Sequence, residues 1–377
     1  MRVLLTGGGT GGHIYPALAL AEELRARGVE DLLYVGTAEG MEARLVPAAG
    51  LPFAVVTARK FSRGRKRDLL TAAGGVAAGF GQAFRLLRRF RPQVVVGTGG
   101  YVCAPVVLAA SLSGIPTVLH EQNAVPGLTN RLLASFVSVV CTTFDESARR
   151  FPPGTRTCHT GLPVRREVLQ LTREEAVTRL GLDPLKKTVL AVGGSLGARR
   201  LNEAMLAVHR YWQGSREVQI LHVTGEADHA VFLRRLKEAG IYPAKSGNIT
   251  VVSYLHHLPQ ALAASDLVVA RAGASFLAEV TARGVAAVLV PYPFAAENHQ
   301  EYNARALLRA GACEMILERD LTPQGLLEKV RALVMDDRKR EDMAARSRAL
   351  GRPEAGQRIL EVLWEVAGNT GFDAGIR

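Results

Sequence analysis

The chain has 377 residues, and its 47 lysines and arginines against 35 aspartates and glutamates give a formal net charge of +12. A single hydrophobic core rarely organises more than about 300 residues, so two domains are expected rather than one. The four cysteines are scattered without a C-x-x-C pair, which argues against a disulfide framework and a zinc site and fits a reducing compartment.

The first half of the chain alternates short apolar runs with helical patterns. Strands are predicted at residues 3–5, 32–35, 53–56, 94–96, 117–119 and 137–141. Helices are predicted at 14–27, 68–90, 102–112 and 128–134. Several runs are apolar throughout, as parallel strands buried on both faces are. The alternation predicts an α/β domain with a doubly wound parallel sheet.

The uncharged stretch 92–120 is long enough to suggest a membrane span. Its glycines and prolines divide it into strand, loop, helix and strand, so we interpret it as buried core of a soluble protein. The N-terminus, with one early charge at Arg2 and a short apolar run, does not have the pattern of an export signal.

The periodicity is lost around residues 151–154 and 161–163 and begins again at Thr188, which predicts a linker region. The N-terminal plan of strand, glycine turn and helix then repeats through residues 193–211. Further strands are predicted at 218–223, 249–252, 267–270, 286–290 and 313–317, and final helices at 323–349 and 354–366. Two similar domains are therefore expected, with glycine loops facing each other across a cleft that holds a phosphate-bearing substrate.

The glycine-rich stretch 7–13 lies between the first predicted strand and helix. Five glycines in six positions indicate a tight turn or a close approach, and a helix N-terminus offers free N–H groups to an anion, so we interpret the stretch as a phosphate cradle. Packing alone needs only one or two glycines. The match to G-x-G-x-x-G also allows a nicotinamide dinucleotide, but the second strand ends in Gly36 and Thr37, and Glu39 comes late for a ribose contact.

His13 ends this loop. A neutral imidazole at that place could act as a general base on a substrate hydroxyl, because its ordinary pKa lies near 6.5. The alternative is a structural hydrogen bond from the ring to the backbone. The sequence contains no acidic partner that must orient the ring.

Polar groups also follow other predicted strands. Stretch 97–101 is a second glycine turn, which is either another anion cradle or a packing turn. Stretch 120–123 begins like H-E-x-x-H, but Ala124 replaces the second histidine, so the metalloprotease motif is excluded. Its clustered hydrogen-bonding groups still suggest substrate contact at a strand end.

Two stretches of the second half have the same character. Stretch 271–279 has the pattern of a strand end, a glycine and a helix start, which places Glu279 in the first two helical turns. Its carboxylate could accept hydrogen bonds from both hydroxyls of a ribose, or it could complement the helix dipole. In 291–303, amides follow two prolines. Amides both donate and accept hydrogen bonds and so recognise sugar hydroxyls, unless they are only solvated helix residues.

A basic run at 59–67 precedes an apolar helix at 69–84 and the cluster Arg85, Arg88, Arg89 and Arg91. Cationic groups beside apolar surface are attracted to an anionic bilayer. Nucleic acid would be attracted equally, but no recognition motif is present and only 6% of the residues are aromatic, so nucleic acid is not expected as a partner. A solvated run of charge is the remaining alternative.

Taken in order, these motifs resemble the signatures of a GT-B glycosyltransferase family, the one that adds N-acetylglucosamine to lipid I to give lipid II in bacterial peptidoglycan synthesis. The stretches that carry the resemblance are 8–13, 99–101, 120–123, 163–165, 193–198, 273–279 and 299–300. Each motif is weak alone, whereas the ordered set covers nearly the whole chain.

The resemblance implies a GT-B fold of two Rossmann-like domains. Residues 1–162 would form the acceptor and membrane-associated domain, residues 163–350 the UDP-sugar domain, and residues 351–377 would contribute a C-terminal helix that returns to the first domain. One departure from the family is Leu162, which stands where the family has asparagine, so no side-chain contact is carried over to that position.

The resemblance also assigns roles by position. Donor-binding residues would be Thr10, Gly11, Gly12, Asn123, Arg165, Ser195, Leu255, Ala274, Ser275, Phe276, Leu277, Ala278, Glu279 and Gln300. Within this set, Ser195 would contact the phosphates and Glu279 the ribose diol. Leu255 would meet the uracil through its backbone, and Gln300 the sugar hydroxyls. The acceptor side would include Gly9, Gly99, Gly100 and Tyr101, and the candidate catalytic residues are His13 and Glu121.

The implied reaction inverts the anomeric carbon and needs no cofactor or metal, which the absence of Asp-x-Asp fits. Implied partners are UDP-N-acetylglucosamine, lipid I, an anionic membrane surface on the cytoplasmic side of the cell membrane, and cell-wall synthesis and division proteins. Alternatives are another GT-B enzyme such as a glycolipid synthase or a UDP-N-acetylglucosamine 2-epimerase, a nicotinamide oxidoreductase, and a non-catalytic membrane scaffold.

Overall fold

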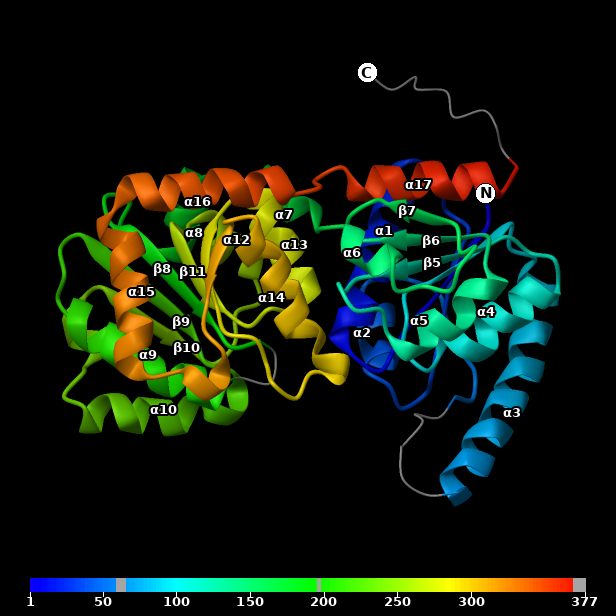
Figure 1. Cartoon of the computed structure of the whole chain (residues 1–377), viewed down its shortest axis with the longest axis horizontal. Helices are drawn as coiled ribbons and strands as arrows, with labels where there is room; N and C mark the ends of the chain where they lie inside the picture. The colour runs from blue at the N-terminus through cyan, green and yellow to red at the C-terminus, as the bar shows by residue number, and fades with distance from the viewer. Residues whose placement is uncertain (59–65, 195–197, 369–377) are drawn as a thin grey trace. The chain divides into compact units, whose positions relative to one another are not determined.

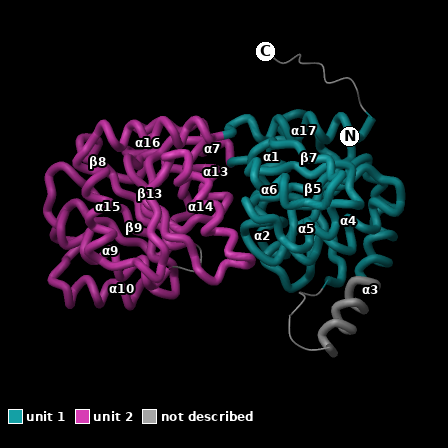
Figure 2. The backbone as a smooth tube through the Cα atoms, in the orientation of Figure 1, with its two compact units in different colours: residues 1–164, 352–377 teal, residues 165–351 magenta. Residues whose placement is uncertain are grey.

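The protein is described by a computed structural model, which covers residues 1–58, 66–194 and 198–368; over 66–77 it gives the backbone only. The chain divides into two compact units (Figure 2). Unit 1 is Met1–Val164 with Arg352–Arg377, and unit 2 is Arg165–Gly351. These divisions lie beside the domain boundaries predicted after residues 162 and 350.

Unit 1 contains a seven-stranded sheet in the order β3-β2-β1-β4-β5-β6-β7, and every neighbouring pair is parallel (Figure 1). Its strands are β1 Val3–Thr6, β2 Leu32–Gly36, β3 Phe53–Val55, β4 Val94–Gly97, β5 Thr117–Glu121, β6 Val139–Thr142 and β7 Thr157–His159. Its helices are α1 Gly11–Ala26, α2 Glu42–Ala48, α3 Lys66–Phe90, α4 Cys103–Leu112, α5 Leu128–Leu133, η1 Ala134–Phe136, α6 Asp145–Ala148 and α17 Ala355–Val366.

Both faces of this sheet are covered, as apolar strands without alternation predict. On one face Val3 and Leu5 share a core with residues of α1 and α17. On the other face Leu4 packs with residues of α3 and α4. Helix α17 lies beside α1, so the end of the chain contributes buried residues to the core of unit 1.

Strand β7 lies in the predicted linker region, between the stretches 151–154 and 161–163, so that part of the prediction was wrong. Its three residues Thr157–His159 are all only partly buried at the edge of the sheet and pair with β6 alone. A short edge strand that is not apolar carries no run for a hydrophobicity pattern to detect.

Unit 2 contains a six-stranded parallel sheet in the order β10-β9-β8-β11-β12-β13. Its strands are β8 Lys187–Val192, β9 Val218–Val223, β10 Ile249–Val252, β11 Leu267–Ala270, β12 Ala286–Leu289 and β13 Cys313–Met315. Its helices are α7 Arg166–Gln170, α8 Arg173–Leu180, α9 Arg199–Trp212, α10 Glu226–Glu238, α11 Pro243–Ser246, α12 Leu258–Ala263, α13 Ala274–Arg283, η2 Ala296–Asn298, α14 His299–Arg309, η3 Glu318–Asp320, α15 Pro323–Met335 and α16 Asp337–Leu350.

The single helix predicted at 323–349 is two helices. Asp336 has extended backbone angles, φ −113° and ψ 95°, and its carboxylate accepts a hydrogen bond from the Lys339 N–H, 2.9 Å away. An aspartate in this N-cap position ends one helix and begins the next. The sequence has a helical pattern on both sides of Asp336, so the pattern alone does not reveal the break.

Each sheet has one point where the strand order reverses, which is where ligands bind in open parallel sheets. In unit 1 this point lies between β1 and β4, and in unit 2 between β8 and β11. The glycine turns after these four strands therefore lie at the two expected binding edges.

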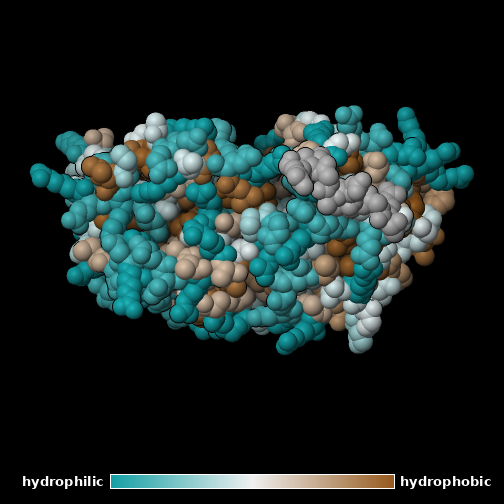
Figure 3. Space-filling model, turned by 90° about the horizontal axis from the view of Figure 1, so that it is seen from above, coloured by the Kyte–Doolittle hydropathy of each residue, from teal (hydrophilic) through white to brown (hydrophobic). Residues whose placement is uncertain are grey.

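Hydrophilic side chains predominate on the face drawn in Figure 3. Within residues 1–58, 66–194 and 198–368, the helices are all too short or too polar to cross a membrane.

Candidate active site

The opening glycine loop of unit 1 is shaped mainly by its own neighbours. A Cβ atom on Gly8 would lie 2.6 Å from a carboxylate oxygen of Glu42, and one on Gly9 would lie 2.9 Å from the ring of Tyr101. A Cβ on Gly7 would collide with the Thr98 hydroxyl. Packing therefore accounts for three of the five glycines, more than the sequence analysis allowed.

Glu42 is a functional-site residue that sequence reasoning missed. Its buried carboxylate accepts hydrogen bonds from the Gly9 N–H at 3.2 Å and from the N–H and hydroxyl of Thr37 at 3.1 and 2.6 Å. A second anion at Gly9 would meet this carboxylate. Of the predicted phosphate cradle, only Gly11 and Gly12 therefore remain as candidates to bind an anion. They begin α1, and Thr10 makes no side-chain cap there.

The second glycine turn, Gly99 and Gly100, also reflects packing. Both residues have positive φ angles, +102° and +84°, which favour glycine. A Cβ on Gly100 would collide with the Gly8 carbonyl, and one on Gly99 would lie 2.9 Å from His13 Nδ1. This turn thus lets the His13 ring approach the backbone closely.

His13 contacts two oxygen atoms through the same ring nitrogen. Its Nδ1 lies 3.0 Å from the Thr98 carbonyl and 3.2 Å from Gln122 Oε1. Burial lowers the pKa of His13, and the two hydrogen bonds oppose that change only in part. The ring is therefore neutral near pH 7, as a general base must be.

Glu121 was predicted as a second catalytic group, and the structure gives its carboxylate other partners. It accepts hydrogen bonds from the Asn123 and Gly127 N–H groups at 2.9 and 3.0 Å, and from the Asn123 and Asn130 amides at 3.3 and 2.8 Å. Burial raises the pKa of Glu121, and these bonds limit the increase. Both carboxylate oxygens of Glu121 therefore accept hydrogen bonds that hold the loop carrying Asn123.

In unit 2, helix α13 begins with unoccupied hydrogen-bond donors. Gly273 is its N-cap and makes no side-chain cap bond, and a Cβ on Gly273 would meet no atom of the described residues within 4 Å. The Ser275 hydroxyl in the first turn is buried without a hydrogen-bond partner among the described residues. Unlike the loop of unit 1, this helix start has space that none of the described residues fills, which suits a bound anion.

Glu279 and Arg165 form a two-pronged ion pair. Arg165 Nε lies 2.8 Å from Glu279 Oε1 and Nη2 lies 3.0 Å from Oε2. The carboxylate keeps further lone pairs, which can accept two ribose hydroxyls. Sequence reasoning placed both residues at the site but did not pair them.

Gln300 links two strand ends. Its Oε1 accepts hydrogen bonds from the Ala272 N–H at 3.2 Å and the Tyr292 N–H at 3.0 Å, which leaves its amide nitrogen to donate. Leu277 is buried in the core, while the half-buried Leu255 follows β10 at the same edge of the sheet. Ser195 lies outside the described residues.

Two other predicted features can be placed. Leu162, the departure from the family pattern, is buried at 3% exposure and packs as an apolar residue. The described residues contain no group of three or more histidines, cysteines, aspartates or glutamates that could hold a metal ion.

The chain matches two family models, the glycosyltransferase family 28 N-terminal domain over residues 3–142 and the glycosyltransferase family 28 C-terminal domain over residues 188–359. It is 51% identical to the UDP-N-acetylglucosamine–N-acetylmuramyl-(pentapeptide) pyrophosphoryl-undecaprenol N-acetylglucosamine transferase of Moorella thermoacetica, over 96% of this chain and 98% of the relative. The transferase of the same name from Desulforudis audaxviator is also 51% identical, over 98% and 99%.

Solved structures agree with these relatives. The crystal structure of Acinetobacter baumannii MurG matches with a TM-score of 0.76 and 30% identity, covering 97% of this chain and 99% of that one. A putative UDP-N-acetylglucosamine 2-epimerase from Listeria monocytogenes matches with a TM-score of 0.70 over 98% and 97%. At 14% identity, the second match shows a shared fold alone.

Proposed function

The chain belongs to glycosyltransferase family 28 and has the GT-B fold, and we propose that it transfers N-acetylglucosamine from UDP-N-acetylglucosamine to the pyrophosphoryl-undecaprenol-linked N-acetylmuramyl pentapeptide, lipid I, to give lipid II. The observation that carries this proposal is the 51% identity to transferases of that name along almost the whole of both chains. The epimerase alternative has only a fold-level likeness in its favour.

Unit 2 supplies groups suited to the donor. The N-terminus of α13 and the Ser275 hydroxyl can donate to the diphosphate, and the Glu279 carboxylate can accept the ribose hydroxyls while Arg165 holds it. Gln300 can donate to a sugar oxygen through its amide nitrogen. Donors that face the leaving diphosphate stabilise the charge that develops on it.

Unit 1 supplies the base. The 4-hydroxyl of the muramyl sugar attacks the anomeric carbon of the donor, His13 takes the hydroxyl proton, and the bond from that carbon to UDP breaks with its electron pair on UDP. One displacement inverts the anomeric carbon without a covalent intermediate. The neutral state of His13 supports this role.

The reaction is proposed to need no metal ion, since helix N-termini can neutralise a leaving diphosphate. Undiminished turnover in excess EDTA is the expected result. Recovery of activity only on adding Mg²⁺ or Mn²⁺ would contradict this part of the proposal.

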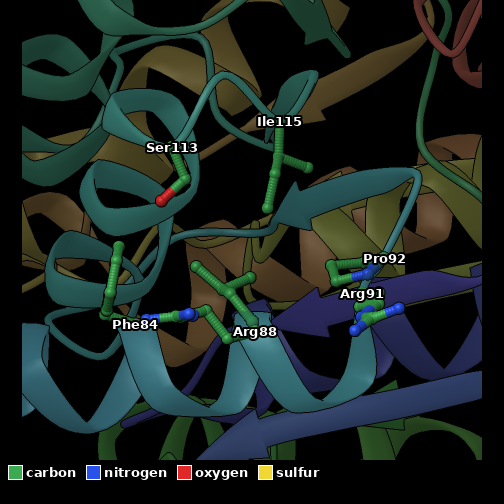
Figure 4. A pocket seen from close by; sticks show the side chains of 7 residues that line it. Phe84, Arg88, Arg91, Pro92, Ser113 and Ile115 are labelled. Carbon is green, nitrogen blue, oxygen red and sulfur yellow. The ribbon is translucent and has the colours of Figure 1, made fainter.

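A groove beside α3 is the proposed membrane contact. It has a volume of about 450 Å³ and combines apolar and cationic side chains. Figure 4 shows Phe84 of α3 pointing toward Ser113 and Arg88 extending along the helix toward Phe84, and the Arg88 guanidinium lies 5.9 Å from the centre of the Phe84 ring. The arginines Arg85, Arg88, Arg89 and Arg91 are all exposed, whereas residues 59–65 of the basic run 59–67 lie outside the described residues.

Apolar surface beside arginines suits an anionic bilayer, which fits an acceptor linked to undecaprenol. We therefore place the protein at the cytoplasmic side of the cell membrane as a peripheral protein, near cell-wall synthesis and division proteins. The double variant Arg88→Glu/Arg91→Glu should bind anionic vesicles less, while Arg149→Glu, another exposed arginine of unit 1, should bind them nearly as the wild type does. Wild-type binding that is indifferent to salt would refute the electrostatic origin.

The function itself is tested by UDP release. Purified protein with UDP-N-acetylglucosamine should release UDP only when a lipid I analogue is present. Epimerisation of the donor without an acceptor would favour the epimerase, and stabilisation against heat by NAD but not by UDP would favour an oxidoreductase. Vesicle binding without any nucleotide binding would favour a membrane scaffold.

A further inference from the structure

In unit 1 a series of hydrogen bonds runs from His120, in strand β5, through Gln122 to His13. The His120 side chain is buried at 1% exposure, and its Nε2 lies 2.8 Å from the Gly161 carbonyl. A carbonyl oxygen only accepts, so Nε2 carries the proton and Nδ1 carries a lone pair. Burial lowers the pKa of His120 to about 4, so the ring stays neutral around pH 7.

This protonation state of His120 fixes the orientation of the Gln122 side-chain amide. The Gln122 Nε2 atom faces three acceptors: the Thr98 carbonyl at 2.8 Å, the His120 carbonyl at 2.9 Å and His120 Nδ1 at 3.2 Å. Turning the amide over would place its oxygen against all three acceptors. Gln122 is buried at 1% exposure, so water does not compete for these bonds.

The amide oxygen consequently faces His13. Gln122 Oε1 and the Thr98 carbonyl lie 3.2 and 3.0 Å from His13 Nδ1, and both atoms only accept hydrogen bonds. Nδ1 must therefore carry the proton, and the lone pair of the neutral ring is left on Nε2. Among the residues that the structure describes, none bonds to His13 Nε2, so that atom can take a proton from a substrate.

We propose that Gln122 is a positioning residue for the transfer reaction: its amide, fixed by His120 and the Gly161 carbonyl, holds His13 in the tautomer whose Nε2 accepts the proton of the acceptor hydroxyl. This inference rests on the proposed function and deepens it. Gln122 acts through His13 and does not touch the substrate. It takes the place that a carboxylate holds beside histidine in many acid–base sites, but it adds no charge.

Two substitutions at the same position separate this role from simple packing. Gln122→Glu puts a carboxylate beside His13, which stabilises the imidazolium, so the acid limb of the kcat/KM profile should move to higher pH by about one unit. Gln122→Met keeps the size but removes the acceptor, so the limb should move to lower pH and kcat should fall by on the order of 10-fold. The KM for UDP-N-acetylglucosamine should stay within about 2-fold of wild type in both variants.

Gln219→Met is the matched control. Gln219 is also a buried glutamine with hydrogen bonds from both ends of its amide, but it lies in unit 2 and bonds Asp183 and Thr188. Its variant should lose stability and keep the wild-type acid limb. Acid limbs that do not move in the two Gln122 variants, or that move in the same direction, would overturn the proposal.

A measurement on the wild type tests the tautomer of His13 directly. In the ¹⁵N spectrum of labelled protein near pH 7, with His13 assigned by its replacement, Nδ1 should show the signal of a protonated nitrogen and Nε2 that of a bare one. The reverse pattern, or an equal mixture, would overturn the proposal even if the enzyme transfers sugar. Failure of wild-type UDP release with the expected tautomer would instead count against the proposed function.

Discussion

Glu279 gives the sharpest test of the donor site. Its side chain is 10% exposed, and its carboxylate holds Arg165 through both oxygens, at 2.8 and 3.0 Å. Glu279→Gln keeps the shape and one accepting oxygen but removes the charge, whereas Glu279→Ala removes every contact. Because ribose contacts act in the ground state and the transition state alike, both variants should raise KM with little change in kcat.

The magnitude follows from the number of bonds. Arg165 uses one lone pair on each oxygen, so two positions remain for two ribose hydroxyls. Hydrogen bonds to a charged group contribute about 1.5 kcal/mol or more each, so losing two costs about 3 kcal/mol. UDP should then bind roughly 100-fold more weakly in Glu279→Ala and about 10-fold more weakly in Glu279→Gln.

The assay is calorimetric titration with UDP, with thermal unfolding in parallel. Asp266→Asn is the matched control, because Asp266 pairs with Arg173 at 3.0 Å in the same unit and Arg173 is 34% exposed, close to the 35% of Arg165. It should unfold more easily and bind UDP as the wild type does. Unchanged UDP binding in Glu279→Ala, or equal weakening in Asp266→Asn, would refute the assignment of Glu279 to the ribose.

Two more predictions follow from other contacts. His209 and His222 bond to each other at 2.9 Å in the core of unit 2, and burial lowers the pKa of His209 from 6.5 to about 3 and that of His222 well below 6.5. Because the unfolded chain binds these protons first, the free energy of unfolding should fall as pH drops below 6.5, by about 2 kcal/mol at pH 5 for His209 and in the same direction for His222, in denaturant titrations. A His209→Leu/His222→Leu variant with an equally steep slope would contradict this origin. Gly99→Ala should lower kcat by on the order of 10-fold in UDP-release assays while UDP binding persists, because its Cβ would press on the His13 ring. Gly154→Ala shares the positive φ but meets no neighbour within 4 Å, and an equal kcat loss there would mean that backbone strain alone is responsible.

The fold could be predicted because most of its strands are continuous apolar runs in the sequence. Runs such as Val94–Gly97 and Leu267–Ala270 are apolar on both faces, as is typical of parallel strands covered by helices on both sides. The edge strand Thr157–His159 and the helix break at Asp336 escaped prediction, because pairing at a sheet edge and a single cap residue leave no periodic signal.

The site could be predicted less completely, because its geometry depends on residues far apart in the chain. The glycines of the opening loop were visible, but the carboxylate of Glu42, 33 residues from Gly9, was not. Arg165 and Glu279 are separated by 114 residues, and no spacing rule joins them. Gln122 was seen only as part of a polar cluster, since the direction of its amide depends on the state of His120.

The chemistry of the product tests the central claim most directly. Wild-type protein, UDP-N-acetylglucosamine and a lipid I analogue should yield an acceptor that is heavier by one N-acetylhexosamine in mass spectrometry. The anomeric proton coupling of that product should show a β-linkage, opposite to the α-configuration of the donor. An unchanged acceptor beside consumed donor would contradict the proposed transfer, and an α-linked product would contradict the single displacement assisted by His13.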